Sequence, residues 1–298
     1  RFSTIDFPNL MHQVAALRVE QAWTIAQPFA TKFLFEDNKT DFRPTKRIRP
    51  SGGNMWERLA KDGKIKHGSA GTEKIYTAEL DTIAQILTFP RDMVINDDIG
   101  YIDQILTLMV DGALMVPDFE LVNKIYNGEA DGFLTEDENL LKGAGNALSE
   151  TTLDTAYQMA RDMAITKGGP TGDLSVKGRF GSKYILVVSA VNERLAWKLT
   201  QPTVVIEPAS TGGGNAAGST NYWYGRIRPM TFEQLGNDTY HPQANDSTWM
   251  LIPEERLYAP WSISYLNNQR RPITEVVSLP ADMLGFGVRG YWDININN

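Results

Sequence analysis

The strongest pattern of apolar and polar positions in the chain lies between residues 99 and 127. Apolar residues recur there at steps of three and four, which places them on one face of a helix; they are Ile99, Ile102, Leu106, Met109, Ala113 and Val116. Pro117 interrupts the pattern, which resumes at Phe119 and continues until Asn127 and Gly128 provide a stop. We expect either one kinked helix or two nearly collinear helices. At about 1.5 Å per residue this helix is roughly 45 Å long, so it should act as the spine of the fold.

Three polar residues mark the start of this spine helix. Asn96, Asp97 and Asp98 carry side chains that can accept hydrogen bonds from the first free N–H groups. Their negative charge also suits the positive end of the helix dipole. We interpret them as a cap rather than as a metal-binding or acid–base pair, because adjacent side chains diverge on a helix.

Three more helices and a buried strand follow from the same reasoning. The spacing of Leu10, Val14, Leu17 and Gln21 predicts a helix between residues 9 and 26. A second amphipathic helix should begin at a Ser149 cap and end at Gly168–Pro170. The apolar run at 183–189 predicts a buried strand, and Ser189 should then cap a helix that reaches about Thr200. Together these elements predict an α/β subdomain with a central sheet.

The last third of the chain alternates between loops and strands. Residues 201–221, centred on a Gly-rich run, should form a flexible loop, and strands are expected at 223–230 and 248–253. Residues 262–266 and 272–278 should pair as a hairpin around a polar turn at 267–271. A final strand at 286–296 should add to a sheet near the spine helix.

Composition narrows the class of protein. The 298 residues are 42% hydrophobic and 22% charged, as in an ordinary globular protein, and no apolar run is long enough to span a membrane. The absence of cysteine excludes disulfides and thiolate metal sites and fits folding in a reducing cytoplasm. The chain begins at Arg1 rather than methionine, which is compatible with a trimmed chain or with a cleaved precursor.

The net charge of −7 is unevenly distributed. Residues 38–74 hold ten basic and four acidic side chains, so this segment carries +6 and the remainder −13. Its strand-like ends, 42–49 and 74–80, flank a Gly-rich middle with few apolar residues, which indicates a long two-stranded extension or, alternatively, a disordered loop. An acidic face of another subunit is the partner we favour, and sequence-independent nucleic-acid binding is the alternative. The candidate contact residues are Arg43, Lys46, Arg47, Arg49, Trp56, Arg58, Lys61, Lys64 and Lys66.

The sequence holds no recognisable catalytic or cofactor site. His12, His67 and His241 lie in separate regions without ligand spacing, and the glycines at 212–214 lack the Lys-Ser/Thr that a phosphate-binding loop needs. There is no Gly-x-Ser-x-Gly elbow and no thiol nucleophile. We therefore expect no enzyme, no metal and no cofactor.

Two stretches resemble a known family. The run RDMVINDDIG at 91–100 resembles the R-x-x-I-N-D-D-L-G signature of Mu-like phage major head proteins. From Gly145 to Leu199 the chain resembles the same family's G-x-x-L-s-x-x-x-L-x-x-A…L-L-V-P…L-E-x-x-A run. The resemblance implies an α+β fold shared with tailed-phage major capsid proteins and encapsulin shells, and a structural role.

The resemblance also implies a division of the chain and a set of partners. The expected parts are an N-terminal arm (1–37), an extended β-hairpin loop (38–78), a peripheral domain with the spine helix (79–129), a central axial domain (130–255) and C-terminal strands of the peripheral domain (256–298). The arm either packs on its own core or reaches along adjacent subunits, and the resemblance favours the second arrangement. The implied function is self-assembly into hexamers and pentamers of an icosahedral head around DNA, within the virion and without a membrane. Expected partners are further copies of the chain, a portal, a maturation protease or scaffold, decoration proteins and DNA bound non-specifically; an encapsulin-type shell with a protein cargo is the alternative.

Overall fold

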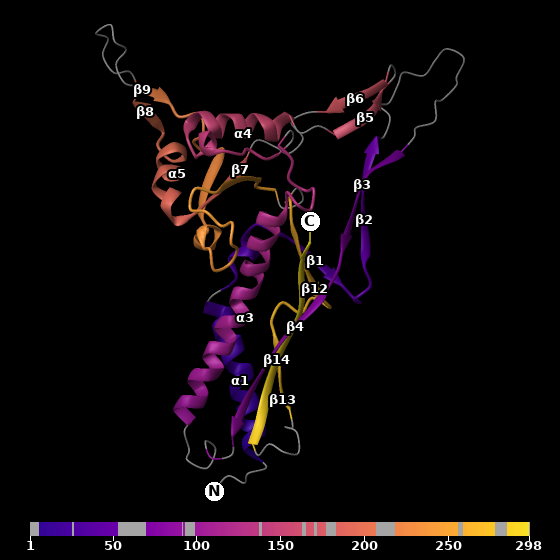
Figure 1. Cartoon of the computed structure of the whole chain (residues 1–298), viewed down its shortest axis with the longest axis vertical. Helices are drawn as coiled ribbons and strands as arrows, with labels where there is room; N and C mark the ends of the chain where they lie inside the picture. Colours follow the sequence, from indigo (N-terminus) through magenta and orange to yellow (C-terminus); the bar gives the residue numbers. More distant parts are fainter. Residues whose placement is uncertain are drawn as a thin grey trace. The chain divides into compact units, whose positions relative to one another are not determined.

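The computed structural model (Figure 1) has a mixed α+β fold and divides into two compact units. It describes residues 6–25, 27–52, 70–90, 92, 99–136, 139–162, 165–169, 172–176, 183–206, 218–255, 259–277 and 285–297. Unit 1 comprises residues 1–45, 78–121 and 261–297, and unit 2 comprises residues 46–77 and 122–260 together with residue 298. The helix α3 (Ile99–Asn127) contributes its first part to unit 1 and its last residues to unit 2.

Unit 1 is built on a five-stranded sheet around the long strand β14 (Gly285–Asn297). Strand β4 (Asp81–Pro90) pairs antiparallel with one edge of β14. On the opposite edge, β12 (Ser262–Leu266) and β13 (Ile273–Val277) pair antiparallel with successive parts of β14. Strand β1 (Phe35–Lys39) lies outside β12 and runs parallel to it. The last strand is therefore the centre of the sheet.

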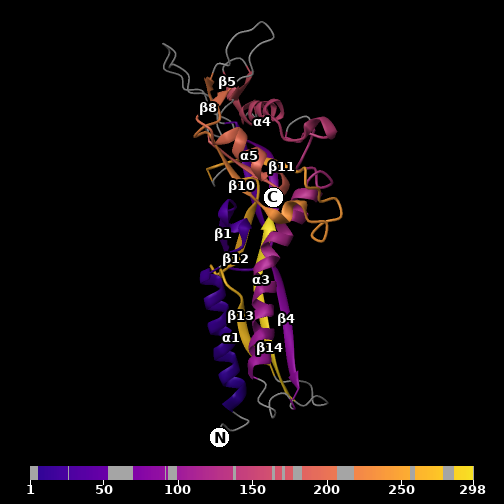
Figure 2. The same cartoon turned by 90° about the vertical axis from the view of Figure 1, so that its left-hand side faces the viewer.

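Two helices cover one face of this sheet (Figure 2). Leu106 and Met109 of α3 pack against Phe89 and Val288, and Val14 of α1 (Asp6–Ile25) joins this cluster. Trp23 of α1 also meets the ring of Trp292 edge-on, with centroids 5.0 Å apart. Helix α1 thus packs on its own chain, which is the first of the two arrangements predicted for the arm. A short 3-10 helix, η1 (Phe29–Lys32), connects α1 to β1.

The centre of unit 2 is a three-stranded sheet in the order β10–β7–β11. The predicted buried strand is confirmed as β7 (Tyr184–Val188), in which every side chain is buried. Strand β10 (Ile227–Thr231) pairs parallel with β7, and β11 (Trp249–Pro253) pairs antiparallel. Side chains of α4 (Glu150–Asp162) and α5 (Glu193–Thr200) share the core with this sheet.

Smaller elements complete the description of unit 2. Three two-stranded sheets pair β2 (Thr45–Gly52) with β3 (Ala70–Ala78), β5 (Ile165–Gly169) with β6 (Gly172–Val176), and β8 (Val204–Ile206) with β9 (Gly218–Thr220). The β2–β3 pair extends across the boundary of unit 1 at its ends. Short 3-10 helices are η2 (Ala144–Asn146), η3 (Ala190–Asn192) and η4 (Glu233–Gly236).

The spine helix is confirmed as one helix with the expected limits, and its buried face includes Leu106 and Met109. Two details differ from the prediction. Phe119 remains 40% exposed, because the 100° rotation per residue sets it opposite the buried side chains. On α1, Leu17 is likewise exposed, whereas Val19 is buried.

The predicted hairpin at 262–278 is wrong in its pairing. Both strands exist at the expected positions, but they follow one another along the same edge of β14 instead of facing each other. Asn267 and Asn268 both have positive φ, as a tight turn requires, and their N–H groups bond to the carbonyl of Lys39 and to Asn38 Oδ1. The turn therefore moves the chain from one part of the β14 edge to the next. As a result, β12 and β13 each pair with β14 instead of with each other.

Four details of unit 2 also differ from the prediction. Helix α4 ends at Asp162, and residues 165–169 and 172–176 form the β5–β6 pair, because glycines at 168, 169 and 172 disfavour helix. Ser189 does not cap the following helix; its hydroxyl donates to the Asp246 carbonyl, and η3 precedes α5. The expected strand at 223–230 begins only at Ile227, after a turn with Gly225 at φ +72°. The expected loop at 201–221 carries β8 and β9 at its ends, and residues 207–217 lie outside the described chain.

Candidate assembly surfaces

The candidate contact residues of the basic segment are only partly described. Arg43 and Lys46 are exposed, and Arg43 lies 4.0 Å from the carboxylate of Asp41. Arg47 and Arg49 lie on β2, where the backbone alone is described. Trp56, Arg58, Lys61, Lys64 and Lys66 lie outside the described residues. The structure therefore places the base of a two-stranded ribbon here, and the grouping of the basic side chains stays a prediction.

The end of β3 is tied to β1 in unit 1. Lys39 is buried and its ammonium donates to the carbonyl of Ala78, the last residue of β3. The side chain of Asn38 accepts from Asn268. The predicted boundary between arm and loop, at 37/38, thus falls inside a sheet strand. The sequence FEDNK has little strand propensity of its own, and pairing with β12 overrides that local preference.

The predicted cap of the spine helix also falls outside the described residues. Asn96, Asp97 and Asp98 are not described, and α3 begins at Ile99, the next residue. The helix start therefore lies where the cap predicts it, and capping by these side chains remains a prediction.

A partly buried carboxylate on α3, that of Asp118, holds the segment that follows α1. Asp118 Oδ1 accepts from the N–H of Ala30 at 2.8 Å, and Oδ2 accepts from the N–H of Phe29 at 3.2 Å. These two N–H groups lie at the start of η1, where the helix offers them no carbonyl acceptor and a carboxylate is favourable. Burial raises the pKa of Asp118, while the two N–H donors and the charge of Lys32 act in the opposite direction. Sequence reasoning missed this contact because it joins residues far apart in the chain.

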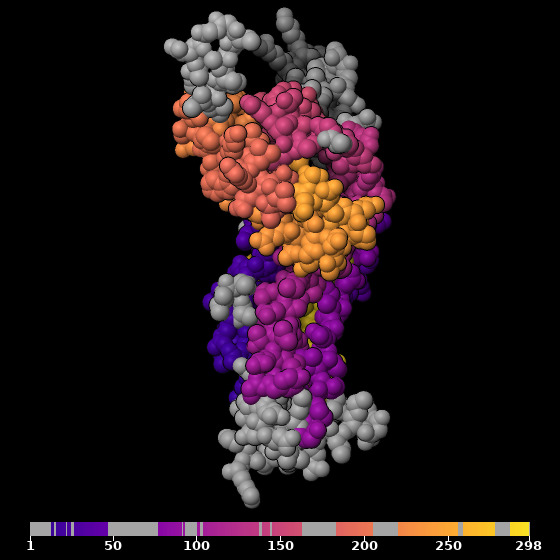
Figure 3. All heavy atoms as spheres, turned by 60° about the vertical axis from the view of Figure 1, so that its left-hand side comes forward, coloured from indigo at the N-terminus to yellow at the C-terminus, as the bar shows by residue number. Residues whose placement is uncertain are grey.

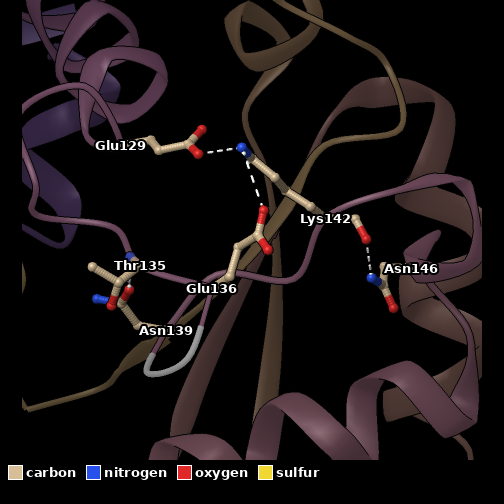
Figure 4. A network of polar contacts seen from close by, with 6 residues as sticks. All are labelled: Glu129, Thr135, Glu136, Asn139, Lys142 and Asn146. Atoms are coloured by element: carbon tan, nitrogen blue, oxygen red, sulfur yellow. Dashed lines mark hydrogen bonds and ion pairs between the residues drawn. The ribbon is translucent and has the colours of Figure 1, made fainter.

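The acidic connection after α3 is folded by a polar network (Figure 4). The ammonium of Lys142 contacts Glu129 and lies 3.5 Å from Glu136. The hydrogen bond to Glu129 is the main reason that the pKa of Lys142 is raised. Asn139 closes the loop by accepting from the Thr135 N–H at 2.7 Å and donating to the carbonyl of Phe133. Part of the acidic charge in this connection is therefore neutralised within the chain.

A rigid turn between β9 and β10 presents aromatic side chains to solvent. Asn221 fixes the turn, since its side chain donates to the carbonyl of Leu199 and accepts from the N–H of Trp223. Trp223 is buried in the core of unit 2, whereas Tyr222 and Tyr224 are about half exposed. The guanidinium of Arg226 lies 4.4 Å from the ring centroid of Tyr222. Exposed tyrosine and arginine on a fixed backbone are typical of protein interfaces.

Other exposed apolar side chains gather on two helices. On α5 and the preceding η3, Trp197 and Val191 are more than half exposed. On α3, the exposed apolar residues are Tyr101, Leu108, Met115 and Phe119. Tyr101, Leu108 and Met115 lie seven residues apart. This spacing can be read from the sequence, but the apolar stripe of the buried face is the stronger pattern.

No catalytic arrangement emerges from the described part of the chain. Within it, no three His, Cys, Asp or Glu side chains converge so as to hold a metal ion. His241 stacks on Tyr126 with ring centroids 5.2 Å apart and lies 3.3 Å from Asn127 Oδ1, so its role is to hold the loop after η4. Among the described helices, none is both long enough and apolar enough to cross a lipid bilayer.

Solved structures share this architecture at low sequence identity. The capsid of Ralstonia phage GP4 is 10% identical, with 91% of this chain and 86% of that chain covered and a TM-score of 0.50. A virus-like particle from Pyrococcus furiosus (9% identity, 95% and 93% covered, TM-score 0.48) and the procapsid of bacteriophage JBD30 (11%, 99% and 72%, 0.43) are also similar. A search of curated proteins finds no match. The match to the GP4 capsid shows that the chain shares its fold with a phage capsid protein.

The sequence itself assigns the family. The model of the phage capsid protein family matches residues 74–298, about three quarters of the chain. The chain belongs to the phage capsid protein family, and its role is structural. Capsid proteins of this fold assemble into shells, so the surfaces described above are candidates for contacts between copies.

Proposed function

We propose that this chain is the major capsid protein of a Mu-like tailed bacteriophage. In this proposal it assembles into hexamers and pentamers that close an icosahedral head around the DNA genome. The observation that carries the proposal is the family match over residues 74–298. The run RDMVINDDIG at 91–100 supports the Mu-like assignment within the family.

The units suggest a division of labour in the shell. We assign unit 1, with α3 and the β14 sheet, to the peripheral domain, and the β7 sheet of unit 2 to the axial domain near the capsomer axes. The 38–78 ribbon then extends over a neighbouring copy. A two-stranded ribbon is marginally stable alone, so contact with another subunit would also stabilise the ribbon.

Affinity in such a shell comes from many modest contacts. Each exposed patch, such as the Tyr222–Arg226 turn or the outer side of α5, buries less area than a stable pair of proteins needs. Contacts formed at the same time within a closed lattice reinforce each other through high effective concentration. Their sum holds the shell while each contact stays weak enough to rearrange during assembly.

The remaining partners follow from the virion setting. Assembly takes place in the host cytoplasm with a scaffold or maturation protease, and the finished head holds a portal and, on its surface, decoration proteins. The net charge of −7 opposes general attraction to DNA, so contact with the packaged genome is non-specific and restricted to basic segments such as 38–74.

Removal of the basic ribbon tests the proposed function. Because Asn38 and Lys39 belong to β1, the deletion should replace residues 46–76 by a short Gly-Ser linker and leave β1 and Ala78 intact. The paired ends of β2 and β3 allow such a linker. We expect a folded chain, by circular dichroism and thermal unfolding, that no longer forms stable particles by light scattering.

Two results would oppose the proposal. Particles of normal size and stability from the deletion variant would remove the ribbon from the assembly mechanism. A full-length chain that stays monomeric but binds DNA with a steep salt dependence would favour the nucleic-acid-binding alternative.

A further inference from the structure

Helix α3 carries a second apolar stripe that the described part of the chain leaves largely exposed. The exposed side chains are Tyr101 (51%), Leu108 (68%), Met115 (55%) and Phe119 (40%). With Gly112, and with the half-buried Ile105 at the edge of the stripe where it also packs against the core of unit 1, they recur at steps of four and three over residues 101–119. This spacing is that of the seam of a coiled coil, and it lies away from the face formed by Leu106 and Met109. Figure 3 shows the surface of α3 in view on this side of unit 1.

Gly112 lies in the middle of this stripe, and no contact in the described part of the chain explains why a glycine is found there. Glycine in the interior of a helix destabilises it relative to alanine. A Cβ placed at Gly112 meets no atom within 4 Å, so the fold does not require glycine there. Gly290 is a contrast, because a Cβ there would lie 2.7 Å from Met109 Cε. A glycine that the fold does not need, on an exposed apolar seam, is suited to the close approach of another backbone.

The stripe is nearly symmetric about Gly112. Leu108 lies four residues before it and Met115 three after it, while Ile105 and Phe119 each lie seven residues away. If two copies of α3 pack antiparallel around a two-fold axis at Gly112, Leu108 faces Met115 of the second copy. Ile105 faces Phe119 in the same way, and the two glycines meet where the helices are closest. A two-fold contact requires such a self-complementary surface.

The exposed area indicates which kind of contact this is. Four side chains about half exposed offer on the order of 100 Å² each, or roughly 400 Å² per copy. A free-standing dimer needs about 800 Å² per partner. The stripe is therefore too small to hold a dimer alone but large enough to contribute within a many-contact lattice. Asp111, exposed beside the stripe, would lie near the Asp111 of the second copy, because equal flanks meet in an antiparallel pair.

We infer that α3 pairs antiparallel with α3 of a second copy of this chain, around a two-fold axis at Gly112. The inference rests on the proposed shell assembly and specifies one of its contacts. It also predicts that Asp111→Asn strengthens the contact, because the substitution removes repulsion between like charges. A different helical partner, such as a scaffold segment, would not bring the Asp111 side chains of two copies together.

A single-cysteine cross-link tests this arrangement in the full-length chain. The chain has no cysteine, so Gly112→Cys introduces the only thiol, and the open space around Gly112 accommodates it. A disulfide requires Cα atoms within about 7 Å, which two copies reach only if residue 112 lies at the axis. In oxidised particles we expect most of the protein to migrate as a dimer on a non-reducing gel. The matched control is Ala16→Cys, an exposed position on α1 of the same unit, which should stay monomeric.

The outcomes separate the contact from the proposed function. Electron microscopy of wild-type particles reports on shell assembly, and their absence would contradict the proposed function. Normal particles of Gly112→Cys that contain only monomeric chains would overturn the α3 pairing and leave the shell assignment standing. If Gly112→Cys prevents assembly, the Leu108→Cys/Met115→Cys variant provides the same readout, since these positions face each other across the axis. A dimer band there supports the pairing, and monomers alone overturn it. Equal cross-linking rates with and without Asp111→Asn would also oppose the two-fold arrangement.

Discussion

Substitution of Asp118 tests how the segment after α1 is held in unit 1. In Asp118→Ala the N–H groups of Ala30 and Phe29 lose their acceptors. Ala30 is fully buried, so its N–H is left without a partner at a cost of about 1 to 3 kcal/mol. The N–H of Phe29 is only partly buried and can be rehydrated, which adds about 0.5 to 1 kcal/mol.

Part of this cost is offset. Burial raises the pKa of the Asp118 carboxyl, so removal of this side chain relieves its desolvation and offsets part of the loss. The expected net loss in the free energy of unfolding is about 2 kcal/mol. For a domain of this size the melting temperature of the unassembled chain should fall by about 4 to 8 °C.

Asp111→Ala is the matched control for this measurement. Asp111 lies on the same helix and is exposed, so its replacement brings the same gain in helix propensity without the loss of buried contacts. Its free energy of unfolding should change by less than about 0.5 kcal/mol. Chemical denaturation followed by tryptophan fluorescence measures both variants. If Asp118→Ala is as stable as Asp111→Ala, the two hydrogen bonds do not anchor η1.

The pH dependence provides a second check on Asp118. Its pKa is raised above the ordinary value of 3.8 by burial. A carboxyl with a higher pKa in the folded state binds its proton more tightly there, so its contribution to stability is full below 3.8 and declines as the pH rises through the raised value. The stability of the wild type relative to Asp118→Asn should therefore decrease from about pH 4 towards neutrality. An increase over the same range would contradict the reasoning.

Two further substitutions test the packing of each unit. In unit 1, Gly290→Ala should lower the free energy of unfolding by about 1 kcal/mol and Gly290→Val by about 3 kcal/mol, because a Cβ at this position displaces the end of Met109. If the valine variant is as stable as the wild type in urea denaturation, the close contact is refuted. In unit 2, Ser149→Ala should cost about 1 kcal/mol, because the hydroxyl accepts from the Thr152 N–H at 3.2 Å at the start of α4, and Ser149→Asp should retain most of that stability. Thermal unfolding of the three proteins would contradict the capping role if both variants match the wild type.

Local patterns in the sequence predicted elements better than their pairing. The limits of α3 and the burial of β7 follow from periodicity and from a continuous apolar run, which are properties of neighbouring residues. The pairing of β12 and β13 depends instead on β14, which lies at the end of the chain. Both strands pair with β14, so they do not form a hairpin with each other. Strand β4 was not predicted because its sequence, DTIAQILTFP, mixes polar and apolar residues. The mixture reflects the fact that only one face of β4 meets α3.

The candidate surfaces show the same limit. Basic residues in 38–74 are visible in the sequence as a charge pattern, but most of them lie outside the described residues. The seven-residue spacing of Tyr101, Leu108 and Met115 was readable, yet only the fold shows that this face is exposed while Leu106 and Met109 are buried. The Asp118 contact could not be predicted, because it joins residues that are almost 90 positions apart.

The most direct test of the account is the assembly state of the purified full-length chain, measured by negative-stain electron microscopy together with light scattering. The account predicts closed shells, or rings of five and six copies that convert to shells at higher protein concentration. A chain that remains monomeric at high concentration, both alone and when co-expressed with the candidate scaffold and protease of its phage, would contradict assembly into a capsid as its function.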